Sequence, residues 1–580
     1  MAVAAALAVT AFSVDLGPSL RAVAERQATE FFQRPVHIGG LRAYVARGEI
    51  EILDARIDGM TAQARPFLTA KRVLVSVPWW TVLRRTLVID RIHVTGLDLF
   101  IDSYPKDVNN IPRLSRPSNG RKLPFTTVIS QVVLDASEFT FRDNDSRWMA
   151  VCRNLNLVVV RALGAHYGRA TFSRGGLTIQ DYLPMAMSFD AGFRIGDGKL
   201  TFNRADLTTD VGVTKLTGVA DLAHWPEQNY HFVSAIDWPE VRRVFFDGSS
   251  WELDGKGTFE GDFHKFRGAF TVKGGVSSPL FQVLTTFGTY RFPRIAGQVL
   301  WTPTTMALSN LDSDFHGGRA VQSYAVQWPG QGRPGLNRWD VSYEGVDLKD
   351  LGDGLAWPVL RLAGRARGHN SLTWTSGQFS ATRGGGGELW SEHPDALRSP
   401  EIPEGLQPVT PDANWTTFDP NKRLSPYPTN ADIKYTWGPE FMETAPGSWA
   451  ATPHTYLSFS GRTAYGDAAQ VPFHLTSTDL QETDRLLVEV LAAFRSPARP
   501  VLTGGFGTFD GVLTKAFWDP HIEGTFDMQH VRYWDVDWGR ARGRTVIDNA
   551  YANMTDTTFR SEEHTSELQS RLHLVCRLLL

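Results

Sequence analysis

The chain has 580 residues, enough for several ordinary domains or for one elongated array of repeats. Charged residues make up 21%, the formal net charge is −3 and no basic run occurs, so the composition excludes a nucleic-acid partner. Glycine (52), proline (32) and tryptophan (18) are plentiful, which favours many short strands joined by turns. Two cysteines, Cys152 and Cys576, exclude a disulfide framework but do not identify the compartment.

Residues 1–14 are apolar and uncharged. A helix needs about 20 such residues to cross a bilayer. Neither a basic segment before this run nor an A-x-A cleavage site after it is present. We expect the second half of a transmembrane anchor whose beginning was lost to a late start codon. A cleaved signal peptide and a buried core helix are the alternatives.

Residues 15–122 are predicted to form an N-terminal unit. An amphipathic helix is expected over 18–34, where apolar residues recur at helical spacing before Pro35. Strands are expected to follow, then a short helix, and then two alternating strands about a turn at Thr95-Gly96. These strands are 36–38, 41–45, 49–57, 68–77, 87–94 and 97–101, the short helix is 79–85, and 102–122 is a loop.

Residues 123–383 are predicted to form a β-rich repeat body, and 428–560 a further repeat of it. Three short helices each follow a strand and open with an aspartate that can cap the helix, and a glycine-punctuated strand follows each helix. The aspartates are Asp237, Asp347 and Asp479, and the strands contain 257–261 (GTFEG), 364–368 (GRARG) and 507–511 (GTFDG). Chance similarity in a glycine-rich chain is the alternative to a true repeat.

Two segments stand apart from this pattern. Residues 384–427 hold four consecutive glycines and many prolines, which predicts an irregular excursion or linker. Residues 561–570 read SEEHTSELQS, which resembles one reading frame of a common sequencing-library adapter. We expect 561–580 to be foreign sequence, with the natural protein continuing past Arg560. A genuine polar tail that ends in a short helix is the alternative.

No catalytic constellation stands out in the sequence. Asp143-Asn144-Asp145 begins like a calcium loop, but the glycine and the closing glutamate of that motif are missing. His316-Gly317-Gly318 is similar to an oxyanion-hole loop, but no G-x-S-x-G elbow accompanies it, so a β-turn is the better interpretation. We therefore expect no enzyme activity, no catalytic or metal-binding residues and no cofactor.

The first hundred residues resemble the AsmA/TamB family of bacterial envelope proteins. Members begin with one inner-membrane helix, an amphipathic helix and a Gly/Arg-Pro-Val-x-Ile strand, which is 33–38 here. A strand pair of the form L-x-I-x-x-I-x-[VL]-x-G matches 87–96, and Asn110-Ile111-Pro112 matches the loop that usually closes the unit. The Gly-Thr-Phe-x-Gly segments resemble the family's β-rich body. The C-terminal TamB domain is not found, so AsmA-like and TamB-like members are not separated.

The resemblance implies a mainly β fold: an elongated, curved antiparallel sheet of repeating units around an open, taco-like groove, with a few short helices and an N-terminal membrane helix. It implies a single-pass protein of the inner (plasma) membrane with its bulk in the periplasm. The implied partners are phospholipid acyl chains, the inner membrane and outer-membrane assembly proteins. Five alternating residues are candidates for the groove lining: Leu87, Ile89, Leu97, Leu99 and Ile101.

Three functions fit this sequence. The first is non-enzymatic lipid transport for outer-membrane biogenesis, since an apolar groove removes the cost of about 0.8 kcal/mol per exposed CH₂ group. The second is a TamB-like translocation or assembly factor for outer-membrane or secreted proteins, whose sheet edges accept client strands. The third is a sugar-binding or sugar-processing β-protein, which the tryptophans permit. We expect the first, because so many strands with so few helices leave little to cover a second face.

Overall fold

The structure is a computed structural model that is mainly β, with 69% strand and 10% helix. It describes residues 15–560 and 574–577, except for 45–46, 62, 79–85, 106–107, 113–125, 146, 223–226, 267–268, 287, 331–332, 356–359, 410–425, 465–468, 494–502, 516–519, 534–535 and 549–550. Thirty of the described strands belong to one largely antiparallel sheet. The chain divides into two compact units, and unit 1 comprises Met1–Asp247, Lys256–Val276 and Gln298–Met306. Unit 2 comprises Gly248–Gly255, Ser277–Gly297 and Ala307–Leu580.

Strands β13 to β16 contribute to both units, and the elements before them belong to unit 1. The elements up to β16 are α2 (Gly17–Phe32), β1 (Val36–Tyr44), β2 (Glu49–Ile57), β3 (Leu68–Ser76), β4 (Thr86–Tyr104), β5 (Val108–Asn109), β6 (Thr126–Asp143), β7 (Trp148–Ala162), β8 (Ala165–Ile179), β9 (Met185–Gly196), β10 (Lys199–Thr209), β11 (Gly212–Asp221), β12 (Glu227–Asp237), α3 (Trp238–Phe245), β13 (Glu252–Phe266), β14 (Ala269–Thr285), β15 (Gly288–Trp301) and β16 (Thr305–Phe315).

The remaining elements belong to unit 2. They are β17 (Gly318–Gln327), β18 (Leu336–Asp347), α4 (Leu348–Gly354), β19 (Leu362–Ala363), β20 (Arg365–Thr375), α5 (Phe379–Thr382), β21 (Gly384–Glu392), β22 (Tyr427–Pro428), β23 (Asn430–Trp437), β24 (Phe441–Ala451), β25 (Thr455–Ala464), β26 (Val471–Ser477), α6 (Leu480–Ala493), β27 (Gly504–Leu513), β28 (His521–Tyr533), β29 (Val536–Asp537), β30 (Arg540–Asp548), β31 (Tyr551–Arg560) and β32 (Leu574–Arg577).

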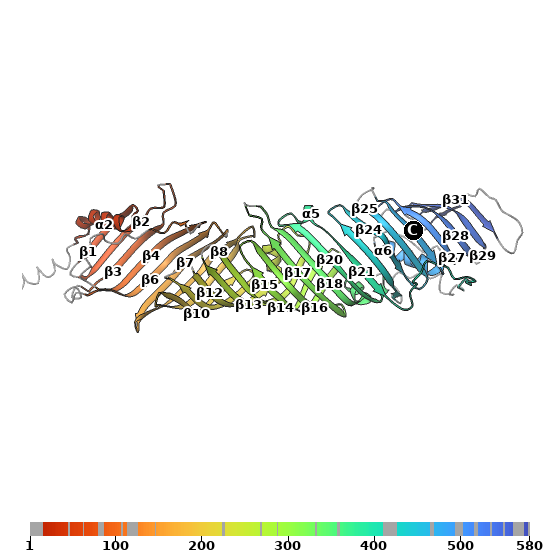
Figure 1. Ribbon diagram of the computed structural model, residues 1–580. Coiled ribbons are helices and arrows are strands. Elements are labelled where there is room, and N and C mark those ends of the chain that lie inside the picture. The colour runs from red at the N-terminus through yellow and green to blue at the C-terminus, as the bar shows by residue number, and fades with distance from the viewer. Residues whose placement is uncertain are drawn as a thin grey trace, which may run out of the picture. The chain divides into compact units, whose positions relative to one another are not determined.

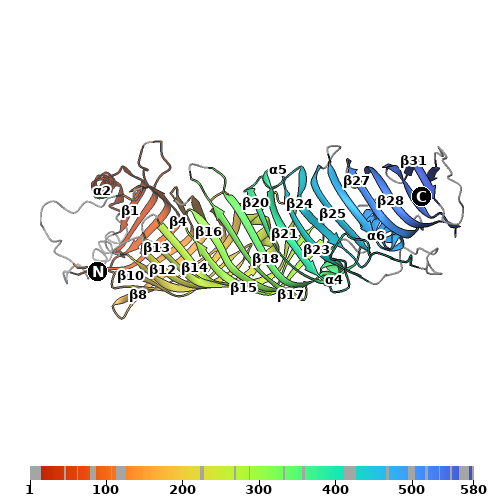
Figure 2. The ribbon, with the colours of Figure 1, turned by 45° about the vertical axis from the view of Figure 1, so that its right-hand side comes forward.

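The strands of unit 1 lie side by side in chain order (Figure 1). Strands β1 to β4 pair antiparallel, β4 pairs in parallel with β6, and β6 to β13 pair antiparallel again. In unit 2 the main strands from β17 to β31 also pair antiparallel with their neighbours along the chain, as Figure 2 shows for β20, β21 and β23. This order needs only short connections, except at the parallel pair.

Irregular residues interrupt six strands of unit 1, and those of β2, β4, β6, β7 and β8 lie at matching places in the ladder. They have positive φ in four strands and register shifts in two more: Asp54 in β2, Gly96 in β4, Ala136 in β6, Asn154 in β7, 172–175 in β8 and 202–205 in β10. A bulge bends its strand and interrupts the alternation of side chains. Cys152 and Leu155, which lie three residues apart on β7, accordingly pack in the same apolar cluster. A row of bulges therefore bends neighbouring strands along one line.

Helix α2 covers the free edge of β1. Side-chain oxygens of Asp15, Glu25 and Thr29 accept hydrogen bonds from backbone N–H groups of β1, over 2.7 Å, 2.8 Å and 3.0 Å respectively. A bare edge strand is a template for unwanted pairing, so this helix ends the sheet at β1. The predicted amphipathic helix is confirmed, but its polar side faces the sheet. Leu20 and Phe31 are 45% and 46% exposed.

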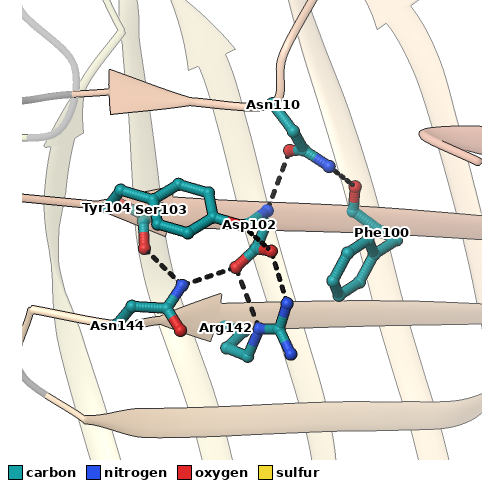
Figure 3. Close-up of polar contacts among 7 residues, drawn as sticks. All are labelled: Phe100, Asp102, Ser103, Tyr104, Asn110, Arg142 and Asn144. Atoms are coloured by element: carbon teal, nitrogen blue, oxygen red, sulfur yellow. Dashed lines mark hydrogen bonds and ion pairs between the residues drawn. The ribbon is translucent and has the colours of Figure 1, made fainter. Parts of the chain in front are cut away.

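A buried polar cluster joins β4 to β6 at the parallel pair (Figure 3). The Asp102 carboxylate is 4% exposed and accepts hydrogen bonds from Arg142 Nε (2.9 Å), the Tyr104 hydroxyl (2.7 Å) and Asn144 Nδ2 (2.6 Å). Burial opposes its ionisation, but these hydrogen bonds outweigh burial and hold the pKa of Asp102 below its usual range. The cluster therefore fixes the ends of two strands with no hairpin between them.

Asn110 of the Asn-Ile-Pro segment completes this cluster. Its side chain accepts a hydrogen bond from the Asp102 N–H and donates one to the Phe100 carbonyl, both over 2.8 Å. These are two backbone groups that a neighbouring strand would otherwise satisfy. The loop motif thus has a structural reason: its asparagine takes the place of a strand at the end of β4.

Replacing Asn110 with Ala should destabilise unit 1 by about 2 kcal/mol, because it leaves a buried N–H and a buried carbonyl unpaired. The free energy of unfolding from urea titration measures the change. Asn203→Ala is the matched control, since Asn203 is exposed on β10. Equal unfolding midpoints for the two variants would show that the Asn110 bridge contributes nothing.

The repeat of strand, helix and strand is present three times. The strands that flank α3, α4 and α6 pair with each other antiparallel in every copy: β12 with β13, β18 with β20, and β26 with β27. In each copy the second glycine of the predicted motif stands opposite an aromatic residue of the preceding strand. The opposed pairs are Phe232 with Gly261, Tyr343 with Gly368 and Phe473 with Gly511. The glycines leave room for the rings.

The predicted aspartate caps are present in two of these three helices. Asp347 accepts a hydrogen bond from the N–H of Lys349 (2.9 Å), and Asp479 accepts one from that of Gln481 (3.0 Å). Asp237 makes no side-chain cap bond to α3. The reason is local: the second residue of α3 is Pro239, which has no N–H to donate.

Three predictions of local structure are wrong. Val36–Tyr44 forms the single strand β1, where two strands were expected at 36–38 and 41–45. Residues 86–104 form the single strand β4, because Gly96 makes a bulge with φ of 65° instead of a turn. Gly384–Glu392 is the central strand β21 and not irregular chain, because backbone pairing with β20 and β23 needs no side chains. Among the described residues from 393 to 409, no strand forms.

The predictions for 1–14 and for the helix at 79–85 lie outside the described residues. No helix in the described ranges has both the length and the apolar character needed to cross a bilayer. Of the segment 561–580 only β32 is described, and it pairs antiparallel with β31. Its foreign origin stays a prediction.

Candidate functional site

The sheet has one polar side and one apolar side, and β13 shows the contrast most clearly. Its exposed positions from Glu252 to His264 carry charged or polar side chains: Glu252, Asp254, Lys256, Thr258, Glu260, Asp262 and His264. The alternate positions are buried or half-buried and include Leu253, Phe259 and Phe263. Successive residues of a strand point to opposite sides, so β13 divides the sheet into these two faces.

Cross-strand ion pairs run along the polar face of both units. Examples are Arg169–Asp190 (2.7 Å) in unit 1 and Arg540–Asp527 (2.8 Å) in unit 2, and His231 is hydrogen-bonded to Asp262 (3.0 Å). Exposed pairs of this kind add little stability each, although directly opposed charges help to hold register. This face is an ordinary solvated surface, and the apolar face is the candidate site.

On the apolar face of unit 1 aromatic rings from seven strands form a continuous row, which we call the aromatic ladder. Neighbouring ring centroids lie 5.6 to 6.3 Å apart, within the range of favourable aromatic pairs. In order the ladder comprises Phe172, Phe189, Phe202, Tyr230, Phe263, Phe270 and Trp301. Only Phe172 is fully buried; the other six rings stay half-buried, so no other part of unit 1 covers them completely.

Gly218 on β11 makes the ladder continuous. It stands opposite Phe202 on one side and Tyr230 on the other, and the two rings meet across it with centroids 5.9 Å apart. A Cβ atom on Gly218 would lie 2.8 Å from the Tyr230 ring. A glycine in a strand often marks a close approach of this kind.

Unit 2 carries aromatic rows on its own strands. Phe281, Phe292, Phe315 and Tyr343 form a second ladder, with centroids 5.0 to 6.3 Å apart. Towards β31, Phe473 stacks on Phe509 (5.5 Å), which stands directly opposite Phe526. Aromatic rows therefore recur in the two units, which the helix-and-strand repeat alone would not require.

Three of the five predicted lining residues lie on the apolar face. Leu99 and Ile101 stand opposite Phe139 and Phe141 of β6, and Phe139 packs in the cluster of Cys152, Phe172 and Met187. Leu97 points to the same side of β4 as Leu99. The sequence predicted these three residues from their alternation alone. It could not give their neighbours on β6, because register is not visible in one strand.

The prediction that all five residues share one face is wrong. Ile89 lies on the same side of β4 as Arg91, whose Nε donates a hydrogen bond to the Gln131 side chain (2.9 Å) on the polar face. The bulge at Gly96 inverts the alternation of side chains. Odd-numbered residues before Gly96 therefore face one side of the sheet, and odd-numbered residues after it face the other. The side chain of Leu87 lies outside the described residues.

A buried ion pair crosses the apolar face of unit 1. Lys265 Nζ on β13 lies 2.8 Å from Asp143 Oδ2 on β6, and the two side chains are 7% and 4% exposed. The ammonium group also lies 5.3 Å from the Trp148 ring centroid. Strands β7 to β12 separate the two partners in the ladder, so the sheet of unit 1 bends back until β6 and β13 meet. Asp143 of the Asp-Asn-Asp segment therefore has a structural partner in Lys265.

The described residues contain no candidate metal centre. No group of three His, Cys, Asp or Glu side chains there could hold a metal ion. Cys152 is buried, and burial followed by the nearby Glu138 raises the pKa of its thiol to about 12. A thiol of that pKa is a poor nucleophile at neutral pH.

The feature that the described residues offer as a candidate site is the apolar face. A face of half-buried aromatic rings suits a long apolar ligand, because it removes hydrocarbon from water without specific hydrogen bonds. In comparisons with known proteins, no protein-family model and no curated protein matches this chain.

Proposed function

We propose that this chain is a non-enzymatic, inner-membrane-anchored periplasmic protein that carries phospholipid acyl chains for outer-membrane biogenesis, in the manner of AsmA-like proteins. The observation that supports it most is the aromatic ladder, whose rings cross seven strands and stay half-buried. In the proposal the apolar face lines an elongated open groove. Each CH₂ group of an acyl chain that leaves water there gains about 0.8 kcal/mol.

The bent sheet supports the same proposal. Aligned bulges and the Lys265–Asp143 contact fold the apolar face of unit 1 inward, while the charged face stays exposed. A flat sheet would leave an acyl chain in contact with water on one side. An inward fold surrounds the chain, so more of its surface is removed from water.

The exposed apolar residues of α2 support attachment to a membrane. Leu20, Val23 and Phe31 of the helix, and Leu16 just before it, are each more than 40% exposed, because the polar side of the helix contacts the edge of β1. Apolar side chains on an exposed helix face are typical of helices that lie at a membrane interface. The proposed anchor at 1–14 directly precedes this helix.

Two adjacent residues of β12 provide the test. Phe232 lies on the apolar face, where its ring is 4.9 Å from that of Phe259, and Val233 is 38% exposed on the polar face. Phospholipid that co-purifies with the full chain should fall at least about five-fold in Phe232→Glu, since a carboxylate in the apolar path is costly to desolvate. Val233→Glu should retain the wild-type amount.

Mass spectrometry of extracted lipid, normalised to protein, gives the measurement. Circular dichroism and the unfolding midpoint establish that both variants are folded. The proposal fails if the wild-type chain carries no phospholipid, or if both glutamate variants carry as much as the wild type.

A TamB-like role in translocation or assembly of outer-membrane or secreted proteins is the second candidate. It is supported by β31, which accepts β32 as an added antiparallel strand through Tyr551–Met554. Addition of a client strand uses the same backbone groups. A client would protect the amides of 551–560 from hydrogen exchange, whereas a lipid would protect the aromatic ladder strands.

A further inference from the structure

Four polar side chains gather on the apolar face of unit 2, and we call them the tyrosine–asparagine cluster: Tyr290 of β15, Tyr343 of β18, Asn370 of β20 and Tyr435 of β23. The Tyr435 hydroxyl donates a hydrogen bond to Asn370 Oδ1, and the Asn370 amide hydrogen-bonds with the Tyr343 hydroxyl. All four side chains are half-buried, so solvent or a ligand can reach them. The remainder of the face around them is apolar.

Two glycines provide the space for this cluster. A Cβ atom on Gly368 would lie 2.5 Å from the Tyr343 hydroxyl, and one on Gly387 would collide with Asn370 and lie 3.0 Å from the Tyr435 hydroxyl. Gly387 is the last of the four glycines at 384–387, a run that suggested irregular chain in the sequence. The run instead keeps β21 free of side chains beside the cluster.

The cluster presents hydrogen-bond donors to a ligand. The bonds to Tyr343 and Tyr435 use one N–H and the carbonyl oxygen of Asn370, which leaves its second N–H and the Tyr343 hydroxyl hydrogen. Burial raises the pKa of Tyr435 to about 12, and burial also raises those of Tyr290 and Tyr343. The hydroxyls are therefore neutral donors at physiological pH, suited to an uncharged or weakly charged oxygen acceptor.

Apolar surface adjoins these donors. Tyr343 is also the last ring of the second aromatic ladder, with its centroid 6.3 Å from that of Phe315. Leu389 stands opposite Gly368 on one side and opposite Ile433 on the other. The side chains of Leu389 and Ile433 are half-buried. A ligand here needs an acceptor oxygen directly attached to hydrocarbon.

We infer that the tyrosine–asparagine cluster binds the ester carbonyl of an acyl lipid, while the apolar residues beside it contact the acyl chain. The inference rests on the proposed function, because it assumes that acyl chains occupy this face. The chemistry it adds is recognition: the face distinguishes an acyl ester from a bare alkyl chain. A carbonyl oxygen can accept hydrogen bonds from the Tyr343 hydroxyl and the Asn370 amide, which a bare alkyl chain cannot.

Competition between ester and ether lipids tests this inference. The full chain is incubated with an equal mixture of a diacyl phosphatidylglycerol and its dialkyl ether analogue, which has the same headgroup but no carbonyl. One hydrogen bond to a carbonyl should enrich the ester about five-fold in the bound lipid. Tyr343→Phe and Asn370→Leu should bring the ratio close to one. Tyr167→Phe, which changes an exposed tyrosine of β8 outside the aromatic ladders, should keep the wild-type ratio.

The outcomes separate the inference from the proposed function. Wild-type chain that binds both lipids equally, or Tyr343→Phe chain that keeps the wild-type preference, would overturn the inference and leave the proposed function standing. Failure of the wild type to bind either lipid would overturn both. A preference that both Tyr343→Phe and Asn370→Leu lose, with total bound lipid unchanged, supports the inference.

Discussion

Lys265→Met is expected to destabilise unit 1 by about 3 to 5 kcal/mol, because it leaves the Asp143 carboxylate buried without its counter-charge. Asp143 and Lys265 are 4% and 7% exposed, so water does not replace the lost partner. The Trp148 and Phe141 rings beside the ammonium group cannot solvate a carboxylate. Urea unfolding of the full chain measures the change.

The double variant Lys265→Met, Asp143→Asn separates the buried charge from other effects. Removal of both charges should recover at least half of the lost stability, since the remaining amide is far less costly to bury than a carboxylate. Lys215→Met removes an exposed lysine of β11 and should have little effect. Equal stability of Lys265→Met and Lys215→Met would show that β6 and β13 are not held together by this pair.

The fold class follows from the sequence because alternation is a local signal. Strands β1, β2, β3 and β12 and the three helices after aspartates are recognisable from spacing alone. Bulges are not: nothing in the residues around Ala136 or Asn154 predicts positive φ, since both residue types also occur in regular strands. An undetected bulge inverts every later side chain of its strand relative to the earlier ones, which is why Ile89, before Gly96, does not share a face with Leu99, after it.

The candidate site depends on register, and register is a relation between strands. Phe202 and Tyr230 are 28 positions apart in the sequence and meet only because Gly218 stands between them on β11. Lys265 and Asp143 meet only because the sheet bends. The glycine run at 384–387 is ambiguous for the same reason. Its own residues carry no side-chain signal, and its strand structure is supplied by the neighbours β20 and β23.

A second large effect is expected at Glu489 of α6. Its side chain is 2% exposed, and its Oε1 accepts a hydrogen bond from the Tyr427 hydroxyl over 3.3 Å. Burial raises the pKa of Glu489 to about 7, against the weaker opposing effects of Tyr427 and Arg485. The folded state therefore binds this proton more tightly than the unfolded chain, whose glutamate has a pKa near 4.5.

The sign of the pH dependence follows from that difference. Protonated Glu489 favours the folded state below about pH 4.5, and this contribution is lost as the pH rises through about 7, where the buried carboxyl must ionise. Glu489→Gln keeps an acceptor for Tyr427 and removes the charge, so it should stabilise unit 2 at pH 8 by about 3 kcal/mol and at pH 4.5 by much less. Urea unfolding at both pH values measures the difference.

Glu443→Gln, which removes an exposed carboxylate of β24, controls for net charge and should show no such dependence. Equal stabilisation by Glu489→Gln at both pH values would mean that the carboxyl does not titrate between them. Burial would then not raise the pKa of Glu489 as stated.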